Sequence, residues 1–338
     1  MSGGVDSSVS ASLLKKEDHD VTGVFIRAWH PDFASCTWQE DRRDAKKVAS
    51  ILNIPLLTLN LEKEYKKNVI DYMFEEYRLG RTPNPDVICN KSIKFGEFFK
   101  WAKAQGADYI ASGHYARVEN SNGVNLLKGV DDNKDQSYFL WAVKKDALTR
   151  TIFPIGGLEK SSVRKHAERT GLPIATKPDS QGLCFVGKFD FKQFLKEHLP
   201  VKRGDVLNTN GEIIGEHDGA ILYTMGERHN FKTTKKSEKD VPLYVVGRDF
   251  NKNEIVVSET KKTGEGYRKE VPLNNINWIR IPLGDKTYTV RIRYRGVLYK
   301  CHVEKDTVIF DSPVDGVTAG QSCVVYDGDI CMGGGIIT

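Results

Sequence analysis

The stretch Ser2-Gly3-Gly4-Val5-Asp6-Ser7-Ser8 opens the chain and runs directly into a helix-forming segment, 9–16. Two adjacent glycines allow a tight turn with no Cβ in the way, so backbone N–H groups and serine hydroxyls can point at one anion. The helix behind the turn adds the positive partial charge of its N-terminus. This order of residues predicts a loop that holds a phosphate or pyrophosphate, although a flexible Ser/Gly-rich chain start has the same composition.

Short apolar strands alternate with helical segments beyond this loop. We expect strands at 21–27, 54–59 and 108–112, and helices at 40–52, 62–77, 89–105, 159–170 and 189–198. Such alternation is typical of an α/β domain with a doubly wound parallel sheet, in which ligands bind beyond the carboxyl ends of the strands. The pattern assigns residues 1–200 to this catalytic domain.

The texture of the sequence changes after residue 200. Turn signals such as Asn210-Gly211 and Asp218-Gly219 separate short strands in 201–270, which indicates a small mixed linking domain. From 271 to 338 the pattern is all strand, with about five short strands predicted at 287–294, 298–304, 307–310, 322–326 and 329–332. Short strands joined by turns predict a small C-terminal β-barrel.

Composition is that of an ordinary globular protein. The chain has 338 residues, a net charge of +5 and no apolar run of the roughly 20 residues that a membrane span needs. We therefore expect a cytoplasmic protein without a membrane partner. Six scattered cysteines without a Cys-x-x-Cys pair argue against a disulfide framework and a metal site. Each lone cysteine is by default a small buried apolar residue, and four receive no role: Cys36, Cys301, Cys323 and Cys331.

Two cysteines have unusual neighbours. Asp86 stands three residues before Cys89, on a proline-rich loop that enters a helix. A helix N-terminus lowers the pKa of a thiol, and the carboxylate could act as a general base; alternatively, Asp86 is a helix N-cap and Cys89 a packed apolar residue. Cys184 lies between Leu183 and Phe185, which could shield a reactive sulfur or simply pack against it. Two such thiols could form a transient redox pair.

Taken together, the motifs resemble a known family. The opening loop resembles the pyrophosphate loop of the ATP pyrophosphatases and lacks the Gly-Lys-Ser/Thr of a Walker loop. With it, motifs in order along the chain resemble the tRNA-specific 2-thiouridylases: Asn84-Pro85-Asp86, Cys89-Asn90-Lys91, Ser112-Gly113-His114, Lys134-Asp135-Gln136, Asp179-Ser180-Gln181 and Cys184-Phe185. In that superfamily a buried strand precedes the loop, whereas here Met1 comes first, so we expect the natural chain to begin earlier.

This resemblance implies ATP-dependent replacement of O2 by sulfur in the wobble uridine of tRNA. A sulfur-relay protein or cysteine desulfurase would load a persulfide on Cys184, and Cys89 would release the sulfur by forming a disulfide with Cys184. Asp86 would be the acid/base group, and Mg²⁺ is expected with ATP. A reductant would then reset the two thiols.

The resemblance also implies binding residues. Those for ATP are Ser2, Gly3, Gly4, Val5, Asp6, Ser7, Ile26 and Gly113, and those for the target base are Asn84, Pro85 and Asp86. Those for the anticodon arm of the tRNA are His114, Lys134, Asp135, Gln136, Arg293, Tyr294 and Gln321. From the residues alone, His114 could equally well be a hydrogen-bonded loop histidine. Residues 134–136 would be interpreted as a solvated turn.

The barrel contains a basic row. Alternation in Arg291-Ile292-Arg293-Tyr294-Arg295 predicts three arginines on one strand face, suited to phosphate contact unless they form an ordinary solvated face. Two other functions stay open at this stage. One is an ATP-dependent ligase or amidotransferase with a small carbonyl substrate, and the other is a tRNA-binding protein without catalysis.

Overall fold

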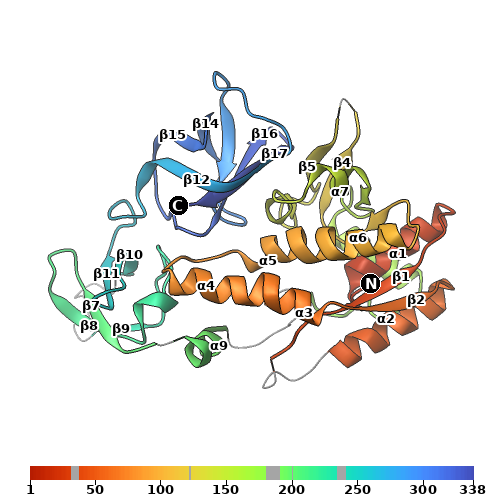
Figure 1. The fold of residues 1–338 in the computed structure, drawn as a ribbon, viewed down its shortest axis with the longest axis horizontal. Coiled ribbons are helices and arrows are strands. Elements are labelled where there is room, and N and C mark those ends of the chain that lie inside the picture. The colour runs from red at the N-terminus through yellow and green to blue at the C-terminus, as the bar shows by residue number, and fades with distance from the viewer. Residues whose placement is uncertain (32–37, 122, 180–190, 200, 234–240) are drawn as a thin grey trace.

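The computed structural model describes residues 1–31, 38–121, 123–179, 191–199, 201–233 and 241–338 (Figure 1). Helix α1 (Val5–Lys16) begins with Gly4 at its N-cap, has Asp6 in its first turn and has Lys15 and Lys16 in its last. These charges oppose the partial charges of the helix ends and stabilise it. Strand β1 (Gly23–Arg27), helix α2 (Trp38–Leu52) and strand β2 (Leu56–Asn60) follow, and the two strands pair in parallel.

Two long helical segments run side by side in Figure 1. The first joins α3 (Glu62–Tyr65), a π-helical stretch (Lys66–Asp71) and α4 (Tyr72–Arg78). The second joins α5 (Pro85–Ile88), a π-helical stretch (Cys89–Glu97) and α6 (Phe98–Ala104). Their apolar faces meet in one core cluster that includes Tyr65, Met73 and Cys89. π-helical turns are frequent at functional positions, and here one begins at a predicted catalytic thiol.

A second parallel strand pair completes the α/β domain. Strand β3 (Ile110–Ala111) pairs with β6 (Thr151–Ile152), and between them lie the hairpin β4 (Ala116–Glu119) and β5 (Asn125–Lys128) and helix α7 (Lys145–Thr149). Helix α8 (Lys160–Arg169) packs on α1 through Val163 and Ala167, and α9 (Phe191–His198) follows. The parallel pairing confirms the predicted α/β class. Within the described residues of this domain, the parallel strands form two pairs, β1 with β2 and β3 with β6, rather than one continuous sheet.

The linking domain is a small sheet in the order β10-β11-β7-β8-β9. Its strands are β7 (Gly204–Leu207), β8 (Ile213–His217), β9 (Phe231–Thr233), β10 (Tyr244–Asp249) and β11 (Glu254–Ser258). Val206, Val245 and Ile255 join the core cluster of the long helices. The linking domain is therefore packed on the catalytic domain.

The C-terminal barrel is confirmed. In the fully described range 268–338 its strands are β12 (Arg268–Trp278), β13 (Tyr288–Arg291), β14 (Tyr299–Glu304), β15 (Thr307–Val314), β16 (Ser322–Asp327) and β17 (Ile330–Ile337), and pairing of β12 with β17 closes the barrel. The sheet also continues into the catalytic domain, because β17 pairs with β5. The exact domain limits at 200 and 270 stay a prediction.

The cysteines of this region are core residues, as their default interpretation predicts. Cys301 and Cys323 are buried in the barrel core, and Cys331 is buried where the barrel meets the catalytic domain. Burial raises the pKa of Cys301 and of Cys331 to about 12 and that of Cys323 well above its ordinary value. In the described part of the chain, no helix has the length and apolar character to cross a membrane.

Candidate nucleotide and tRNA site

The predicted phosphate loop is a compact turn at the N-terminus of α1. Gly3 has a φ of +73°, and a Cβ there would lie 2.2 Å from the backbone oxygen of Asp41, so only glycine fits. The hydroxyls of Ser2 and Ser7 lie 3.1 Å apart, and the Ser2 N–H donates to the Ser7 hydroxyl at 3.1 Å. The loop therefore gathers hydroxyl and amide groups at the positive end of a helix.

Gly113 lies directly against this loop. It follows β3, and a Cβ on it would lie 2.7 Å from the carbonyl carbon of Asp6 and 2.7 Å from the nitrogen of Ser7. The structure thus brings together two segments that are far apart in the sequence and that were both predicted to bind ATP. Only glycine allows this close approach of the two backbones, which holds the segment after β3 against the loop.

A lysine that the sequence did not single out reaches the loop from α8. Lys160 Nζ donates to both carboxylate oxygens of Asp6, at 2.7 and 2.9 Å, and its side chain is only 12% exposed. The Tyr115 hydroxyl donates to the same carboxylate at 2.8 Å, and burial together with Asp6 raises the pKa of Tyr115. Lys160 and Tyr115 therefore fix the orientation of the Asp6 carboxyl group behind the loop.

Asp179 connects the same lysine to two further cations. Its carboxylate accepts from Lys160 at 2.8 Å, Lys134 at 2.6 Å and Arg164 at 2.8 Å. Burial alone would raise the pKa of Asp179, but the hydrogen bonds from Lys134 and Lys160 outweigh it and lower that pKa to about 2. The cluster places positive charge beside the loop, where a polyphosphate needs it.

Lys177 supports the loop from another side. Its Nζ donates to the Gly3 carbonyl at 3.2 Å and to Asp41 and Asp44, each at 2.8 Å. Sequence reasoning missed this residue, Lys160 and Arg164. The four-residue spacing of Lys160 and Arg164 indicates that both lie on one helix face, and this was the one pattern in the sequence that could have pointed to a basic cluster.

The predicted base-binding segment begins α5. Asn84 occupies the N-cap position, Pro85 is the first helical residue and Asp86 lies in the first turn. The alternative that Asp86 is the N-cap is therefore wrong, because the cap falls two residues earlier, before the proline. Cys89 is 0% exposed, as the packed-residue interpretation expects, so in this conformation its thiol is closed off from solvent.

The barrel contacts this segment directly. Asn84 Nδ2 donates to Gln321 Oε1 at 3.0 Å, and Asn84 Oδ1 accepts from the Ser322 N–H at 2.7 Å. Figure 1 shows the chain between α4 and α5 passing below the barrel. Gln321 and Asn84, both predicted to face tRNA, therefore lie together although they come from different domains.

The 134–136 segment is not the solvated turn that composition alone allowed. Asp135 is 1% exposed and accepts from the N–H groups of Gly129 and Ser137, each at 3.1 Å, and from Arg291 at 2.8 Å. Gln136 Oε1 accepts from the Tyr115 N–H at 3.0 Å. In this conformation Asp135 and Gln136 shape the loop, and Lys134 points to Asp179.

His114 is also largely enclosed. It is 8% exposed, its Nδ1 lies 2.8 Å from the Ser112 hydroxyl, and its ring lies 5.8 Å from that of Phe95. Burial, with a smaller contribution from the charge of Lys94, lowers the pKa of His114 well below its ordinary value. The histidine is therefore neutral, which matches the hydrogen-bonded loop residue rather than a phosphate-binding cation.

The expected row of arginines on one strand face is wrong. Strand β13 ends at Arg291, and Arg295 has a φ of +56°, so the chain turns instead of continuing the alternation. Arg291 bonds Asp135, Arg295 donates to the Asn133 carbonyl, and Arg293 donates to the Met225 carbonyl. These arginines face the other domains because carboxylate and carbonyl oxygens there accept their hydrogen bonds.

Three predicted residues remain to be placed. Tyr294 packs its ring 4.4 Å from the ring of Phe139, at the contact between barrel and catalytic domain. Ile26 lies on β1, half-buried against the core cluster that contains Cys89. Cys184, with Cys36, lies outside the described residues.

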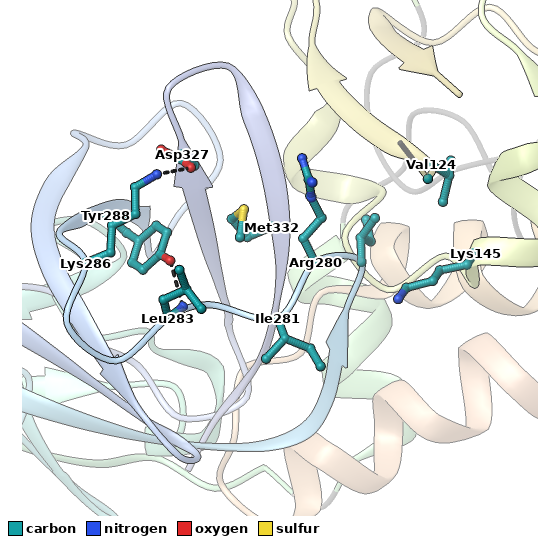
Figure 2. Close-up of a pocket in the computed structure, with 11 residues that line it drawn as sticks. Val124, Lys145, Arg280, Ile281, Leu283, Lys286, Tyr288, Asp327 and Met332 are labelled. Atoms are coloured by element: carbon teal, nitrogen blue, oxygen red, sulfur yellow. Dashed lines mark hydrogen bonds and ion pairs between the residues drawn. The ribbon is translucent and has the colours of Figure 1, made fainter. Parts of the chain in front are cut away.

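A separate cavity of about 550 Å³ lies between the barrel and the catalytic domain. Figure 2 shows Val124 and Lys145 on its catalytic-domain side, and Tyr288 and Met332 on its barrel side. None of the predicted site residues lines it.

Comparison with known proteins covers all three domains. Residues 1–188 match the family described as the tRNA methyl transferase HUP domain, 192–259 its PRC-barrel domain, and 268–337 the aminomethyltransferase β-barrel domain. The chain is 45% identical to tRNA-specific 2-thiouridylase MnmA of Listeria innocua, and 44% identical to the proteins of that name in Bacillus subtilis and Enterococcus faecalis. Each match covers 100% of this chain and 93% of the relative.

The two kinds of description differ in the group transferred. The domain descriptions speak of methyl transfer, whereas the relatives that match from end to end are named for thiolation. Identity of this level over three domains is the more specific finding. The chain therefore belongs to the family of tRNA-specific 2-thiouridylases, MnmA.

Proposed function

We propose that this protein uses ATP to replace O2 of the wobble uridine of tRNA by sulfur, giving 2-thiouridine. The observation that carries the proposal is the end-to-end identity of 45% to a tRNA-specific 2-thiouridylase. A phosphate loop alone would be compatible with many ATP-dependent enzymes, including the ligase considered above. The close contact of the barrel with the predicted base-binding segment supports a polymeric substrate that spans both domains.

The loop at residues 2–7 and Gly113 would bind the nucleotide. When bound, ATP supplies an adenylyl group for O2 of the base, which turns a poor leaving group into a good one. Amides and hydroxyls of the loop would hold the phosphates, and the cations around Asp179 would offset the charge of the departing pyrophosphate. Among the described residues no cluster of three metal-binding side chains occurs, so Mg²⁺ would arrive with the phosphates.

The sulfur steps are assigned to two thiols. A sulfur-relay protein or cysteine desulfurase would leave a persulfide on Cys184, whose terminal sulfur attacks C2 of the base while AMP departs. The Cys89 thiolate then attacks the Cys184 sulfur, which forms a Cys89–Cys184 disulfide and releases the thiolated base. A two-electron thiol reductant restores both cysteines. Because Cys89 is 0% exposed here, the start of the helix must open for this step.

The ends of the Cys184 segment support this pairing. Asp179, which precedes it, is bound to the cation cluster behind the phosphate loop. Helix α9, which follows it, packs Phe194 and Leu195 into the same core cluster as Cys89. The residues that flank the segment therefore lie at the cation cluster on one side and in the core cluster of Cys89 on the other.

The remaining roles concern tRNA and the base. Asp86 would exchange a proton beside the base, with Asn84 and Pro85 holding it. Tyr294 would contact the anticodon arm. The contacts assigned to six further residues would require their side chains to leave their present partners: His114, Lys134, Asp135, Gln136, Arg293 and Gln321. The cytoplasm, where tRNA is available, is the expected compartment.

Mass spectrometry of nucleosides tests the proposal. Unmodified tRNA is incubated with the full chain, MgATP and a persulfide donor, and we expect 2-thiouridine only when all components are present. Turnover of ATP to AMP without any thiolated nucleoside, under conditions where a Listeria relative produces it, would refute the assignment.

A further inference from the structure

The contact between barrel and helix α5 uses a side chain that would normally serve the helix. Asparagine at an N-cap usually accepts a hydrogen bond from an N–H of the first turn. Asn84 makes no such bond. Its Nδ2 and Oδ1 bond Gln321 and the Ser322 N–H of the barrel instead. The orientation of Asn84 is therefore set by the barrel.

Gln321 binds the chain on the other side of Pro83 as well. Its Nε2 donates to the Thr82 carbonyl at 2.8 Å and to the Pro83 carbonyl at 3.4 Å, while the Thr82 N–H donates to the Ala319 carbonyl at 2.9 Å. The backbones approach closely, because a Cβ on Gly320 would lie 2.9 Å from both the nitrogen and the oxygen of Thr82. One glutamine thus fixes the chain immediately before the helix that carries Asp86 and Cys89.

We propose that Gln321 is a positioning residue, which acts through Asn84 to hold the start of α5 and with it Asp86 and Cys89. The catalytic roles of Asp86 and Cys89 rest on the function proposed above, whereas the contact of Gln321 with the start of α5 does not depend on that function. It differs from a role as a tRNA contact alone, because the glutamine acts before any RNA is present. A displacement of the barrel would therefore also displace the start of α5.

A measurement without tRNA tests the contact. In Gln321→Ala we expect Cys89 to react with a thiol reagent about tenfold faster, and the amides of 84–90 to exchange hydrogen faster, both read by peptide mass spectrometry. Gln105→Ala makes the same change at the exposed far end of the same helical segment and leaves both rates unchanged. Unchanged rates in Gln321→Ala would overturn the proposal.

A second variant guards against misfolding. Gln321→Glu keeps the size and the oxygen that accepts from Asn84, but sets a carboxylate against the carbonyls of Thr82 and Pro83. We expect faster Cys89 labelling here too, with an unchanged circular dichroism spectrum. A wild-type labelling rate in this variant would equally contradict the positioning role.

Kinetics separate positioning from simple binding. At saturating tRNA we expect Gln321→Ala to lower kcat about tenfold with a smaller change in KM. In the double variant Asn84→Ala/Gln321→Ala we expect kcat to fall less than about twofold below that of the slower single variant, because both side chains act through one contact. A raised KM with unchanged kcat would show a tRNA contact only. If the chain makes no 2-thiouridine, the labelling rates still test the contact, so the two proposals fail separately.

Discussion

Replacing Asp135 tests whether the barrel is held to the catalytic domain by a buried charge pair. The carboxylate is fully enclosed and Arg291 is 11% exposed, with Nε of Arg291 buried and without a partner. Asp135→Asn can keep the oxygen that accepts from Gly129 and Ser137 but loses the charged hydrogen bond to Arg291, which costs about 2 kcal/mol. Asp135→Ala also removes the two backbone contacts, and we expect about 4 kcal/mol.

Urea unfolding followed by circular dichroism measures these differences. Asp132→Asn, at the exposed neighbouring aspartate, is the matched control and should change stability by less than about 0.5 kcal/mol. Combining Asp135→Asn with Arg291→Met should cost at least about 1 kcal/mol less than the sum of the single changes, because no buried charge is left alone. A cost below about 0.5 kcal/mol for Asp135→Asn, or strict additivity, would refute the reasoning.

Three further predictions concern the site. Cys184→Ala should abolish 2-thiouridine formation while filter binding still detects ATP and tRNA; undiminished product would remove Cys184 from the mechanism. Gly113→Ala should raise the KM for ATP at least about tenfold, since its Cβ would meet backbone at 2.7 Å, whereas Gly157→Ala, with open space around it, should leave that KM unchanged; equal values for both would contradict the loop geometry. The pKa of Asp179 is lowered to about 2, so its contribution to stability is complete above its ordinary pKa near 4 and is lost as pH falls toward 2. Urea midpoints at pH 5 and pH 2.5 should therefore converge for wild type and Asp179→Asn at the lower pH, and a constant gap would contradict this linkage.

Local patterns predicted the elements well. Apolar spacing predicted helices at 62–77 and 89–105, where the structure has helical segments at 62–78 and 85–104, and turn residues marked the strands of the barrel. Gly3 was correctly taken as part of a tight turn, because that requirement belongs to the residue itself, whereas the close approach of Gly113 to the loop was not predicted.

Contacts between distant segments were beyond the reach of such patterns. The spacing of Lys160 and Arg164 places both on one helix face, but it does not indicate that Lys160 reaches the phosphate loop, and nothing near Lys177 does so either. The arginines at 291–295 alternate as on a strand face, yet hydrogen-bond partners in two other domains outweigh that local preference. The position of a polar side chain on a loop depends on which hydrogen-bond partners lie near it, and those partners are known only once the whole chain has folded.

The pairing of β17 with β5 has a consequence for fragments of this protein. Leu127 and Leu126 pair with Ile330 and Cys331, and the Lys128 N–H donates to the Asp329 carbonyl at 2.9 Å. Removing the barrel would uncover an apolar strand edge whose backbone groups could template association with other chains. The catalytic domain produced alone is thus expected to aggregate, because in the full chain the barrel covers this strand edge and keeps it from other chains.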